Sequence, residues 1–358
     1  MRRKRCSWND SRWSVILRDS ATSPQNADYW EKTPEGKISC RLCPQICQIP
    51  AGQTGFCKVR RHQDDGFISM NKCMISGMAL DPVEKKPLYH FYPGRLILSV
   101  GTIGCSLGCE FCQNWQISRD FAADSSAVTR RVTPAELVEY ALKTREADGN
   151  IGLAYTYSEP GVWFEFLKEV MPLARESGLR NVLVTNAFLN PGPWRELLQW
   201  TDAANIDLKG FTEEFYRKLC HGKLQPVLDN IRAAVGRIHL ELTTLLIPGA
   251  NDSPAEIAKM AAWIGTLDPA IPWHLSRYYP NYKLDYPATP PETLERAARI
   301  AKESLQFVYL GNLGRENDTL CPDCGRLWVE RAGYRTRVLA GERCPQCGRA
   351  TRLIQEPR

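Results

Sequence analysis

Short apolar runs alternate with amphipathic stretches through the middle of the chain, beginning at Arg95. A short apolar run predicts a buried strand, and apolar residues at helical spacing predict one buried face of a helix. The predicted strands lie at 96–100, 151–156, 181–185, 203–208, 239–247, 273–278 and 307–310. The predicted helices lie at 134–147, 161–175, 192–200, 212–235, 254–266 and 291–304.

Three of these helices begin with a capping signal. Thr133, Ser253 and Thr289 each stand directly before a proline and shortly before a glutamate, the pattern of a helix N-terminus. Strands that alternate with helices form parallel sheets with right-handed crossovers. The chain offers fewer units than a complete eightfold barrel, so we expect an α/β fold with a partial barrel or an open doubly wound sheet. Both place their chemistry at the carboxyl ends of the strands.

The alternation stops on both sides of this region. Residues 1–35 are polar, basic and without periodicity, which predicts a loose extension, and 36–94 form an irregular cysteine-rich segment. Residues 95–316 form the α/β domain. Residues 317–358 hold another cysteine group and predict a further domain, which is so small that it needs a metal to fold.

The composition is that of an ordinary globular protein, with 43% hydrophobic and 24% charged residues among 358. The formal net charge of +6 is concentrated near the two ends, so the body needs no polyanionic partner and nucleic-acid binding is not expected. Neither a membrane span nor a signal peptide is predicted, and we expect a cytoplasmic protein. In that compartment, 14 cysteines indicate metal or redox chemistry more than disulfides.

The central cysteine motif directly follows the first predicted strand. Cys105, Cys109 and Cys112 have C-x3-C-x2-C spacing, with Phe111 just before the last of them. Three thiolates can hold three irons of a [4Fe–4S] cluster and leave the fourth iron open to a small molecule. The alternatives are a zinc site or buried free thiols, but zinc prefers four closed ligands and this loop has no fourth cysteine.

Two further cysteine groups flank the domain. Cys321, Cys324, Cys344 and Cys347 form two C-x2-C pairs, each followed by glycine, which predicts a zinc ribbon; a rubredoxin-like iron fits the same thiolates. The N-terminal set is Cys40, Cys43, Cys47 and Cys57, with Cys73 as a spare fifth candidate. It predicts zinc, an auxiliary iron–sulfur cluster, or free thiols.

The sequence resembles the radical SAM superfamily, in particular the branch of pyruvate formate-lyase activating enzymes and, within it, the AmmeMemoRadiSam system proteins. The resemblance covers roughly residues 29–358. It is carried by Cys40-Arg-Leu-Cys43-Pro, Gly55-Phe-Cys57, the stretch from Asp81 to Gly94, Cys112-Gln-Asn-Trp115, Tyr155-Thr-Tyr-Ser-Glu-Pro160, Asn205-Ile-Asp-Leu-Lys-Gly210, Thr244-Leu-Leu-Ile-Pro-Gly249 and Tyr309-Leu-Gly-Asn312.

This resemblance implies a partial (β/α)6 TIM-type barrel that binds a [4Fe–4S] cluster and S-adenosylmethionine. The cluster would pass an electron to the sulfonium and release a 5′-deoxyadenosyl radical. A ferredoxin or flavodoxin would supply the electron, and Memo-type and AMMECR-type proteins are the implied partners. The implied cofactor-binding residues are Phe111, Thr156, Tyr157, Ser158, Glu159, Thr185, Asn186, Asp207, Lys209 and Asn312.

Some of these positions depart from the superfamily pattern or have a structural alternative. Tyr157 and Ser158 replace two glycines before Glu159, which either orients the cofactor or caps the next helix. Asp207 and Lys209 are two residues apart, so in a strand their side chains point the same way. The pair either recognises a zwitterionic ligand or forms a plain ion pair.

Two single departures also bear on function. Val184 stands where activating enzymes carry an acidic residue, and Tyr279 where relatives often have histidine. His274, nearby, is at least as well explained as a packed residue.

Three functions compete. The first is hydrogen abstraction from a substrate within the AmmeMemoRadiSam system, and the second is the formation of a glycyl radical on a partner protein. The third is a metal-stabilised scaffold or nucleic-acid-binding ribbon, which leaves the central motif unexplained. The residues themselves do not specify a substrate, and no catalytic acid–base pair is predicted.

Overall fold

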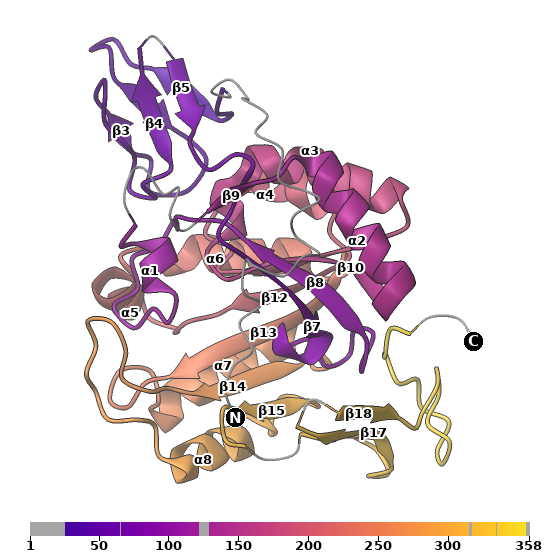
Figure 1. Ribbon diagram of the computed structural model, residues 1–358. Coiled ribbons are helices and arrows are strands. Elements are labelled where there is room, and N and C mark those ends of the chain that lie inside the picture. Colours follow the sequence, from indigo (N-terminus) through magenta and orange to yellow (C-terminus); the bar gives the residue numbers. More distant parts are fainter. Residues whose placement is uncertain (1–25, 65, 122–128, 315–316, 334, 356–358) are drawn as a thin grey trace. The chain divides into compact units, whose positions relative to one another are not determined.

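The computed structural model describes residues 26–64, 66–121, 129–314, 317–333 and 335–355. The chain divides into two compact units. Figure 1 labels their helices and strands where there is room. The first unit comprises Met1–Asp81, Ile97–Gly108 and Asn114–Thr201, and the second comprises Pro82–Leu96, Cys109–Gln113 and Asp202–Arg358. Each unit contains part of the predicted α/β domain and one of the two flanking cysteine groups.

The first unit is built on four strands, in the sheet order β11-β10-β8-β7. They are β7 (Gly77–Pro82), β8 (Leu96–Gly101), β10 (Asn150–Tyr155) and β11 (Arg180–Thr185). β10 and β11 are parallel, and every residue of β10 is buried, which explains its continuous apolar sequence. The helices are α2 (Pro134–Asp148), η3 (Pro160–Trp163), α3 (Phe164–Glu176) and α4 (Pro191–Leu198).

The part of the cysteine-rich segment up to Asp81 belongs to the first unit and, with neighbouring residues, forms short antiparallel strands. β1 (Trp30–Lys32), β2 (Ile38–Cys40) and β3 (Gln48–Ile49) form one sheet, and β4 (Arg60–Gln63) pairs with β5 (Gly66–Ser69). β6 (Met74–Ile75) pairs with β9 (Arg130–Arg131), and α1 spans Trp115–Ser118. Such short strands cannot show the alternation by which strands are recognised. β1 falls within the predicted extension of 1–35, whose residues 1–25 lie outside the described part.

The second unit carries four parallel strands that are neighbours in chain order. They are β12 (Ala203–Asp207), β13 (His239–Leu246), β14 (Trp273–Arg277) and β15 (Val308–Gly311). Asp207 lies opposite Thr243, so the last residue of β12 is paired inside the sheet. The helices are η1 (Val83–Lys85), α5 (Glu213–Phe215), the π-helix η4 (Tyr216–Cys220), α6 (Leu224–Ala234), α7 (Pro254–Leu267) and α8 (Pro291–Ala301).

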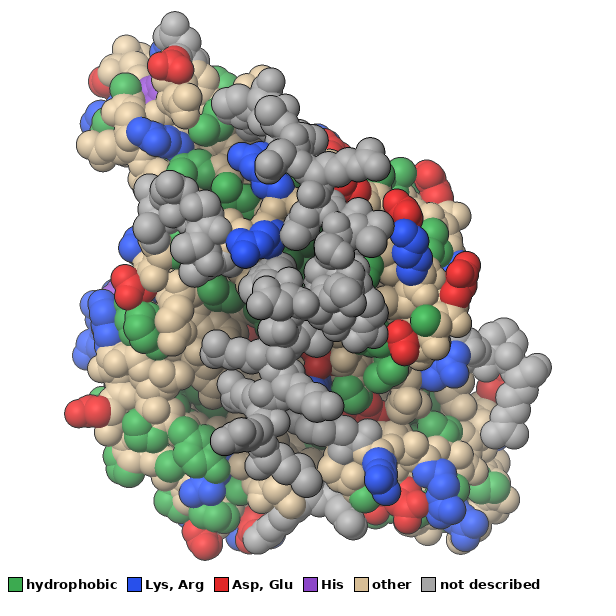
Figure 2. Space-filling view, viewed as in Figure 1, with side chains coloured by type: hydrophobic (Ala, Val, Ile, Leu, Met, Phe, Trp, Pro, Cys, Tyr) green, Lys and Arg blue, Asp and Glu red, His purple; other side chains and the backbone are tan. Residues whose placement is uncertain are grey.

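The C-terminal cysteine group belongs to an antiparallel sheet of β16 (Thr319–Leu320), β17 (Leu327–Ala332) and β18 (Arg335–Val338). Trp328 is fully buried and shares a hydrophobic cluster with Phe307 and Tyr309. Basic side chains gather over the β17–β18 hairpin (Figure 2). The small domain therefore packs through its apolar face within the second unit.

The predicted α/β class with parallel strands is confirmed, and each predicted strand is found within one residue of its expected bounds. Thr133 forms a capping box with Glu136, and Ser253 accepts the Glu256 N–H, as predicted.

Two helix predictions are wrong. The helix expected at 212–235 is broken because His221 takes a left-handed φ of +53° after η4. Thr289 does not cap α8, which begins at Pro291; its buried hydroxyl instead accepts the Tyr278 N–H and donates to the Leu246 carbonyl.

Among the described residues, no helix combines the length and the apolar character that crossing a membrane requires.

Candidate active site

The Cys105 loop, defined here as residues 102–108, directly follows β8 in the first unit. Its turn requires Gly104, whose φ of +88° is left-handed and whose added Cβ would lie 2.7 Å from a methyl carbon of Val59. The Glu159 N–H donates to the Gly104 carbonyl at 3.4 Å. The loop is therefore shaped by backbone geometry before any ligand is considered.

The sulfur of Cys105 is surrounded by N–H donors. The Leu107 N–H donates to it at 3.4 Å and the Asn186 side-chain amide at 3.6 Å. Asn186 is oriented in turn, because its Oδ1 accepts the Phe188 N–H at 2.8 Å. N–H groups that point at a sulfur favour its thiolate form and tune the potential of an iron–sulfur cluster. The structure thus brings Asn186, a predicted site residue, to Cys105.

Glu159 connects the ends of β10 and β11. Its side chain is almost fully buried and accepts the Thr185 hydroxyl at 2.6 Å, the Asn186 N–H at 2.8 Å and the Gly161 N–H at 2.8 Å. Glu159 is also the N-cap of η3. These contacts support the helix-cap interpretation, and they make Glu159 a positioning residue for Thr185 and Asn186. A direct contact of Glu159 with the cofactor stays a prediction.

The backbone carbonyls at the end of β10 already have protein partners. The Asn114 amide donates to the Tyr157 carbonyl at 2.6 Å, and the Ser158 N–H donates to the Thr156 carbonyl at 3.0 Å. Tyr157 has a left-handed φ of +71°, which turns the chain at this point. A carbonyl oxygen has two lone pairs, so each of these groups retains the capacity to accept the amino group of a bound cofactor.

In the second unit, Cys109 lies beside charged and thiol side chains. The Lys209 ammonium contacts the Asp207 carboxylate at 2.9 Å, so these two predicted residues form an ion pair at the end of β12. A hydrogen bond with the Cys220 thiol, together with burial, raises the pKa of Cys109 well above its ordinary value, and Lys209 acts against that rise. A cation is thus available to stabilise negative charge near this sulfur.

Sequence reasoning missed Cys220 and Tyr216, both contributed by the π-helix η4. The Lys209 N–H donates to the Tyr216 hydroxyl at 3.1 Å. Their place in the chain gave no signal, because only the fold brings residue 220 near residue 109. A π-helix often marks a functional site, and the sequence carries no rule for finding it.

The predicted residue Phe111 packs against Phe215 of α5, with ring centroids 6.0 Å apart. Gly210 makes room for this contact, since a Cβ there would lie 2.6 Å from the Phe215 ring. The Glu110 N–H donates to the Leu219 carbonyl at 2.9 Å. Residues 109–113 are therefore held by α5 and η4.

Asn312 ends β15 in a left-handed conformation, with φ of +62°. Its amide donates to the Arg277 carbonyl at 3.2 Å, and its own carbonyl accepts the Tyr279 hydroxyl at 3.4 Å. Arg277 also lies over the Tyr279 ring. Tyr279 therefore belongs to a cluster of polar side chains at the ends of β14 and β15. The resemblance to the family implied a histidine at this position.

His274 is a packed residue, as its structural interpretation predicted. It contacts the fully buried Glu241 at 2.6 Å, and His239 contacts the other oxygen of Glu241 at 2.9 Å. His90 donates its backbone N–H to the same carboxylate at 2.7 Å. These hydrogen bonds and charges hold the pKa of Glu241 well below its ordinary value despite burial.

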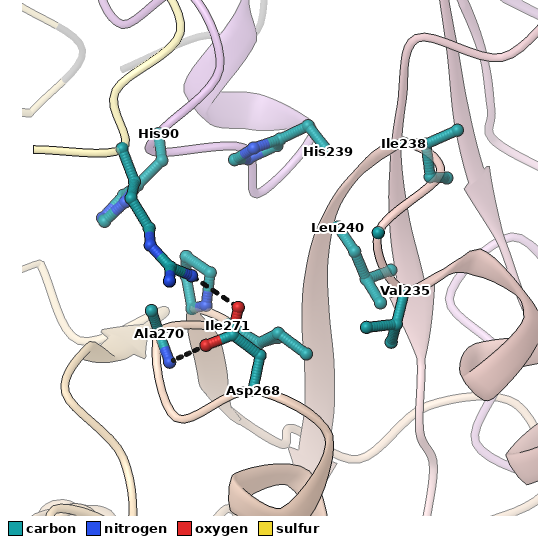
Figure 3. A pocket seen from close by; sticks show the side chains of 11 residues that line it. His90, Val235, Ile238, His239, Leu240, Asp268, Ala270 and Ile271 are labelled. Atoms are coloured by element: carbon teal, nitrogen blue, oxygen red, sulfur yellow. Dashed lines mark hydrogen bonds and ion pairs between the residues drawn. The ribbon is translucent and has the colours of Figure 1, made fainter. Parts of the chain in front are cut away.

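A pocket of about 190 Å³ lies beside this group (Figure 3). It is lined by His90 and His239, by apolar residues before β13, and by Asp268, which pairs with Arg352. The lining residues within 235–240 and 268–272 lie just before or at the start of β13 and β14, so the pocket lies at the amino ends of these strands. The predicted chemistry belongs to the opposite ends.

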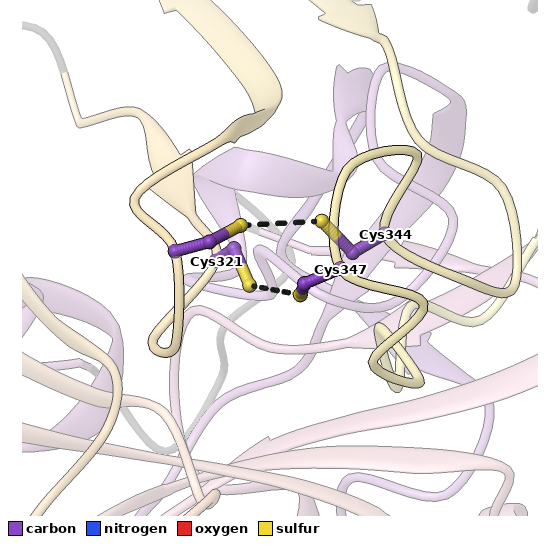
Figure 4. A group of neighbouring side chains, drawn as sticks. Cys321, Cys344 and Cys347 are labelled. Carbon is purple, nitrogen blue, oxygen red and sulfur yellow. Dashed lines mark hydrogen bonds between the residues drawn. The ribbon is translucent and has the colours of Figure 1, made fainter.

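The four C-terminal cysteines are gathered into one group (Figure 4). All four sulfurs lie within 4.8 Å of one another, with Cys321 3.5 Å from Cys347 and Cys324 3.6 Å from Cys344. Tetrahedral zinc with Zn–S bonds of about 2.3 Å separates its sulfurs by roughly 3.8 Å. Gly325 and Gly348 have left-handed φ values and complete the two turns. The donor set fits a zinc ribbon, and the same geometry accepts iron.

In the described parts of the chain, no other group of three or more His, Cys, Asp or Glu residues is as tightly gathered. The N-terminal cysteines are nevertheless neighbours, since Cys57, Cys40 and Cys47 all act on the Cys43 thiol. Burial first, and these thiols next, raise the pKa of Cys43 well above its ordinary value. The metal predicted at these four cysteines stays a prediction.

The surroundings of Cys105 in the first unit and of Cys109 in the second each contain groups that can stabilise a metal-bound thiolate. The sulfur of Cys105 accepts two N–H groups, and Lys209 brings positive charge to Cys109. The Cys112 N–H donates to the Cys109 carbonyl at 3.2 Å, which closes a tight turn between the last two cysteines. The cysteines assigned to the cluster, Cys105, Cys109 and Cys112, remain a prediction.

The comparisons with known proteins agree with this chemistry. The family model described as the radical SAM superfamily matches residues 99–261. An uncharacterized protein of Methanocaldococcus jannaschii is 37% identical over 341 residues, covering 92% of this chain and 99% of that protein. A pyruvate formate-lyase-activating enzyme of Staphylococcus epidermidis is 25% identical over 196 residues, covering 50% of this chain and 72% of that protein.

Among solved structures, a radical SAM methyltransferase from Sphaerobacter thermophilus is similar with a TM-score of 0.48 and 17% identity. The match covers 85% of this chain and 80% of that chain. From the family match and the extended identity to the archaeal relative, the chain belongs to the radical SAM superfamily.

Proposed function

We propose that this radical SAM enzyme binds a [4Fe–4S] cluster through Cys105, Cys109 and Cys112 and cleaves S-adenosylmethionine reductively. The proposal rests most directly on the Cys105 loop, where a strand end, a left-handed glycine and two N–H donors present one thiolate. When bound, the cluster and S-adenosylmethionine supply a 5′-deoxyadenosyl radical, which abstracts a hydrogen atom from the substrate.

The chain's own residues bind and orient. Asn186 and the Leu107 N–H stabilise the Cys105 thiolate, and Glu159 keeps Asn186 in place through its backbone N–H. Lys209 provides a cation and Asp207 an anion at one strand end, a pair that suits the carboxylate and amino groups of a methionine moiety. Asn312 offers an amide at the end of β15, where we place the adenosine part.

The substrate class defines two candidate functions. The first is an oxidoreductase-type hydrogen abstraction within the AmmeMemoRadiSam system, with Memo-type and AMMECR-type proteins as partners; it is supported by the sequence blocks shared with that group. The second is formation of a glycyl radical on a partner protein, supported by the relatives named pyruvate formate-lyase-activating enzyme. Val184 favours the first, because it removes the acidic residue that activating enzymes carry at that place.

In either case we propose a ferredoxin or flavodoxin as electron donor in the cytoplasm. We assign a structural zinc ion to Cys321, Cys324, Cys344 and Cys347, whose four sulfurs already satisfy a closed coordination sphere. This site takes no part in the radical chemistry.

The test is a spectroscopic titration of the anaerobically reconstituted protein. Reduction with dithionite should give the EPR signal of one [4Fe–4S]⁺ cluster, and S-adenosylmethionine should change that signal because it binds the open iron. A signal that is insensitive to S-adenosylmethionine would contradict the proposal. Candidate substrates labelled with deuterium would then separate the two functions. In the second function the deuterium that enters 5′-deoxyadenosine must come from a labelled glycine of a partner protein, and in the first it comes from another labelled substrate.

A further inference from the structure

The N-terminal cysteine segment contacts the Cys105 loop directly within the first unit. The Gln45 side-chain amide, which lies between Cys43 and Cys47 in the sequence, donates to the Ser106 carbonyl at 3.1 Å. The Arg119 guanidinium donates to the Phe56 carbonyl at 3.0 Å and to the Cys105 carbonyl at 3.4 Å. Gln45, from the segment, and Arg119, which follows the loop in the chain, thus connect the loop to the segment that carries the first cysteine group.

The segment and the loop are also tightly packed against each other near Gly104. An added Cβ on Gly104 would lie 2.8 Å from the Cys57 carbonyl oxygen. Cys57, Val59, Ile103 and Val162 form one buried hydrophobic cluster. A shift of Cys57 would therefore be transmitted to Ile103 and Gly104, since packed side chains of this kind do not slide independently.

The four N-terminal cysteines are less tightly gathered than those of the ribbon, but three of them are buried together in one short segment. Cys40, Cys43 and Cys57 are each no more than 8% exposed. The Cys47 sulfur accepts the Phe56 N–H at 3.3 Å, and the Cys40 N–H donates to the Cys47 carbonyl at 2.9 Å. The second bond closes the Cys40–Cys47 loop, and the first ties the Cys47 sulfur to the backbone just before Cys57.

A buried charge beside these cysteines points the same way. Arg60 is 1% exposed and pairs with Glu165 at 2.7 Å. Its Nε–H has no hydrogen-bond partner among the described residues, and its charge interacts with Cys40 and Cys57. Glu165 balances the charge of Arg60, but its Nε–H remains an unsatisfied buried donor, which is costly. A metal centre with thiolate ligands at Cys40 and Cys57 would bring further negative charge towards that donor.

We propose that Cys40, Cys43, Cys47 and Cys57 bind one thiolate-ligated metal centre, and that this centre fixes the Cys105 loop so that it can receive its cluster. The ligand class is a thiophilic metal, supplied as Zn²⁺ or as iron with sulfide. The second half of the proposal rests on the radical SAM function proposed above. Gln45 and Arg119 are positioning residues in this scheme, because they act on the loop through its backbone.

The first experiment counts metal in the full chain after Cys105, Cys109 and Cys112 are all changed to alanine. Parallel preparations receive zinc alone or iron with sulfide, and bound zinc, iron and sulfide are measured after desalting. We expect the ribbon's metal and one further centre, and the further centre should disappear when Cys43→Ser and Cys57→Ser are added. Cys73→Ser is the matched control, because Cys73 is a buried cysteine that is not one of the four proposed ligands. This variant should retain the further metal centre. Only the ribbon's metal in both preparations would overturn the metal site.

The second experiment measures cluster assembly with the three central cysteines intact. Arg119→Gln should keep the N-terminal metal but lower the yield of the EPR-active central cluster by roughly tenfold, as loss of supporting contacts does at other metal sites. Cys43→Ser with Cys57→Ser should lower it at least as much. Unchanged yield in both variants would overturn the coupling alone. Absence of a central cluster in the unsubstituted chain would instead overturn the proposed function, while the metal count above would still stand.

Discussion

The ribbon and the Cys105 loop use cysteine in different ways. In the ribbon, sulfur faces sulfur: Cys321 lies 3.5 Å from Cys347, and both turns end in a left-handed glycine. In the loop, the sulfur of Cys105 faces N–H donors instead, from Leu107 and Asn186.

This difference separates a closed site from an open one. The ribbon's ligands complete a tetrahedron from a single stretch of chain, so a metal there has no vacant position and its role is to hold the fold. The loop depends on residues from other strand ends, such as Asn186 after β11, to present its sulfur. A site assembled in this way can leave a coordination position for a ligand, which is what reductive cleavage requires.

The largest effect should come from the open site. Cys109→Ala removes one of the three proposed cluster ligands, and we expect complete loss of the [4Fe–4S] signal and of S-adenosylmethionine cleavage while the ribbon's metal is retained. Iron, sulfide and zinc analysis together with product assay measures this. Cys73→Ala serves as control and should behave as the unsubstituted chain. Cleavage that survives in Cys109→Ala would mean that this ligand is wrongly assigned.

The closed site should show the reverse pattern. Cys344→Ser with Cys347→Ser removes two of the four ribbon ligands, and structural zinc in small domains contributes about 10–16 kcal/mol to folding. We expect loss of one metal and rapid proteolysis within 321–347, with the central cluster still formed. Simultaneous loss of the cluster signal would show that the two sites are not independent.

A smaller effect is expected at the end of β12, in the second unit. Lys209→Met leaves the Asp207 carboxylate without its 2.9 Å partner, and removes the cation proposed to bind the cofactor's carboxylate. Loss of one charge-assisted hydrogen bond of about 1.5 kcal/mol weakens binding roughly tenfold. Equilibrium binding of S-adenosylmethionine to the reconstituted enzyme measures it. Lys218→Met breaks only the exposed Lys218–Glu214 pair and should change nothing; equal losses in both would remove Lys209 from the site.

The smallest expected effect is a pH dependence of stability, and it arises where His90 and Tyr309 contact the first strand of the ribbon. His90 contacts the Tyr309 hydroxyl, which in turn contacts Thr319 of β16. Burial lowers the pKa of His90 to about 3, although the nearby Glu241 carboxylate acts in the opposite direction. Positive charge from His239, Arg331 and His274 adds to the lowering. The unfolded chain therefore binds a proton near pH 6.5 that folded His90 does not, so its contribution to stability falls as the pH drops from 6.5 towards 3. The lowered pKa of Glu241 adds a further loss below its ordinary value of 4.5.

Thermal unfolding followed between pH 7 and 4 checks this linkage. His90→Gln should flatten the acid dependence, whereas His221→Gln, at an exposed histidine, should leave it steep. An equally steep profile in His90→Gln would rule out His90 as the group that binds the proton.

The sequence predicted what depends on long local patterns. Strands such as β10 are continuous apolar runs because both faces are buried, and the ribbon's paired spacing fixes its knuckles without help from the rest of the chain. The short strands of the cysteine-rich segment carry no period, so they could not be predicted. The break at His221 was missed although the sequence signals it, because Gly222 follows directly and Pro226 stands in the first turn of α6.

The site residues could be predicted only where they form a local sequence motif. The spacing of Cys105, Cys109 and Cys112 is local, but the placing of Cys220 beside Cys109 depends on how η4 returns to residues 109–113. Likewise, Glu159 was predicted as a site residue, but its contacts with Thr185 and Asn186 at the end of β11 depend on the parallel pairing of β10 and β11.

The most direct test is a product count under reducing, oxygen-free conditions. Reconstituted protein given S-adenosylmethionine and dithionite should form methionine and 5′-deoxyadenosine in equal amounts, and neither without the reductant. If the protein carries its full iron and sulfide, binds S-adenosylmethionine, and still yields neither product, the open-site account is contradicted.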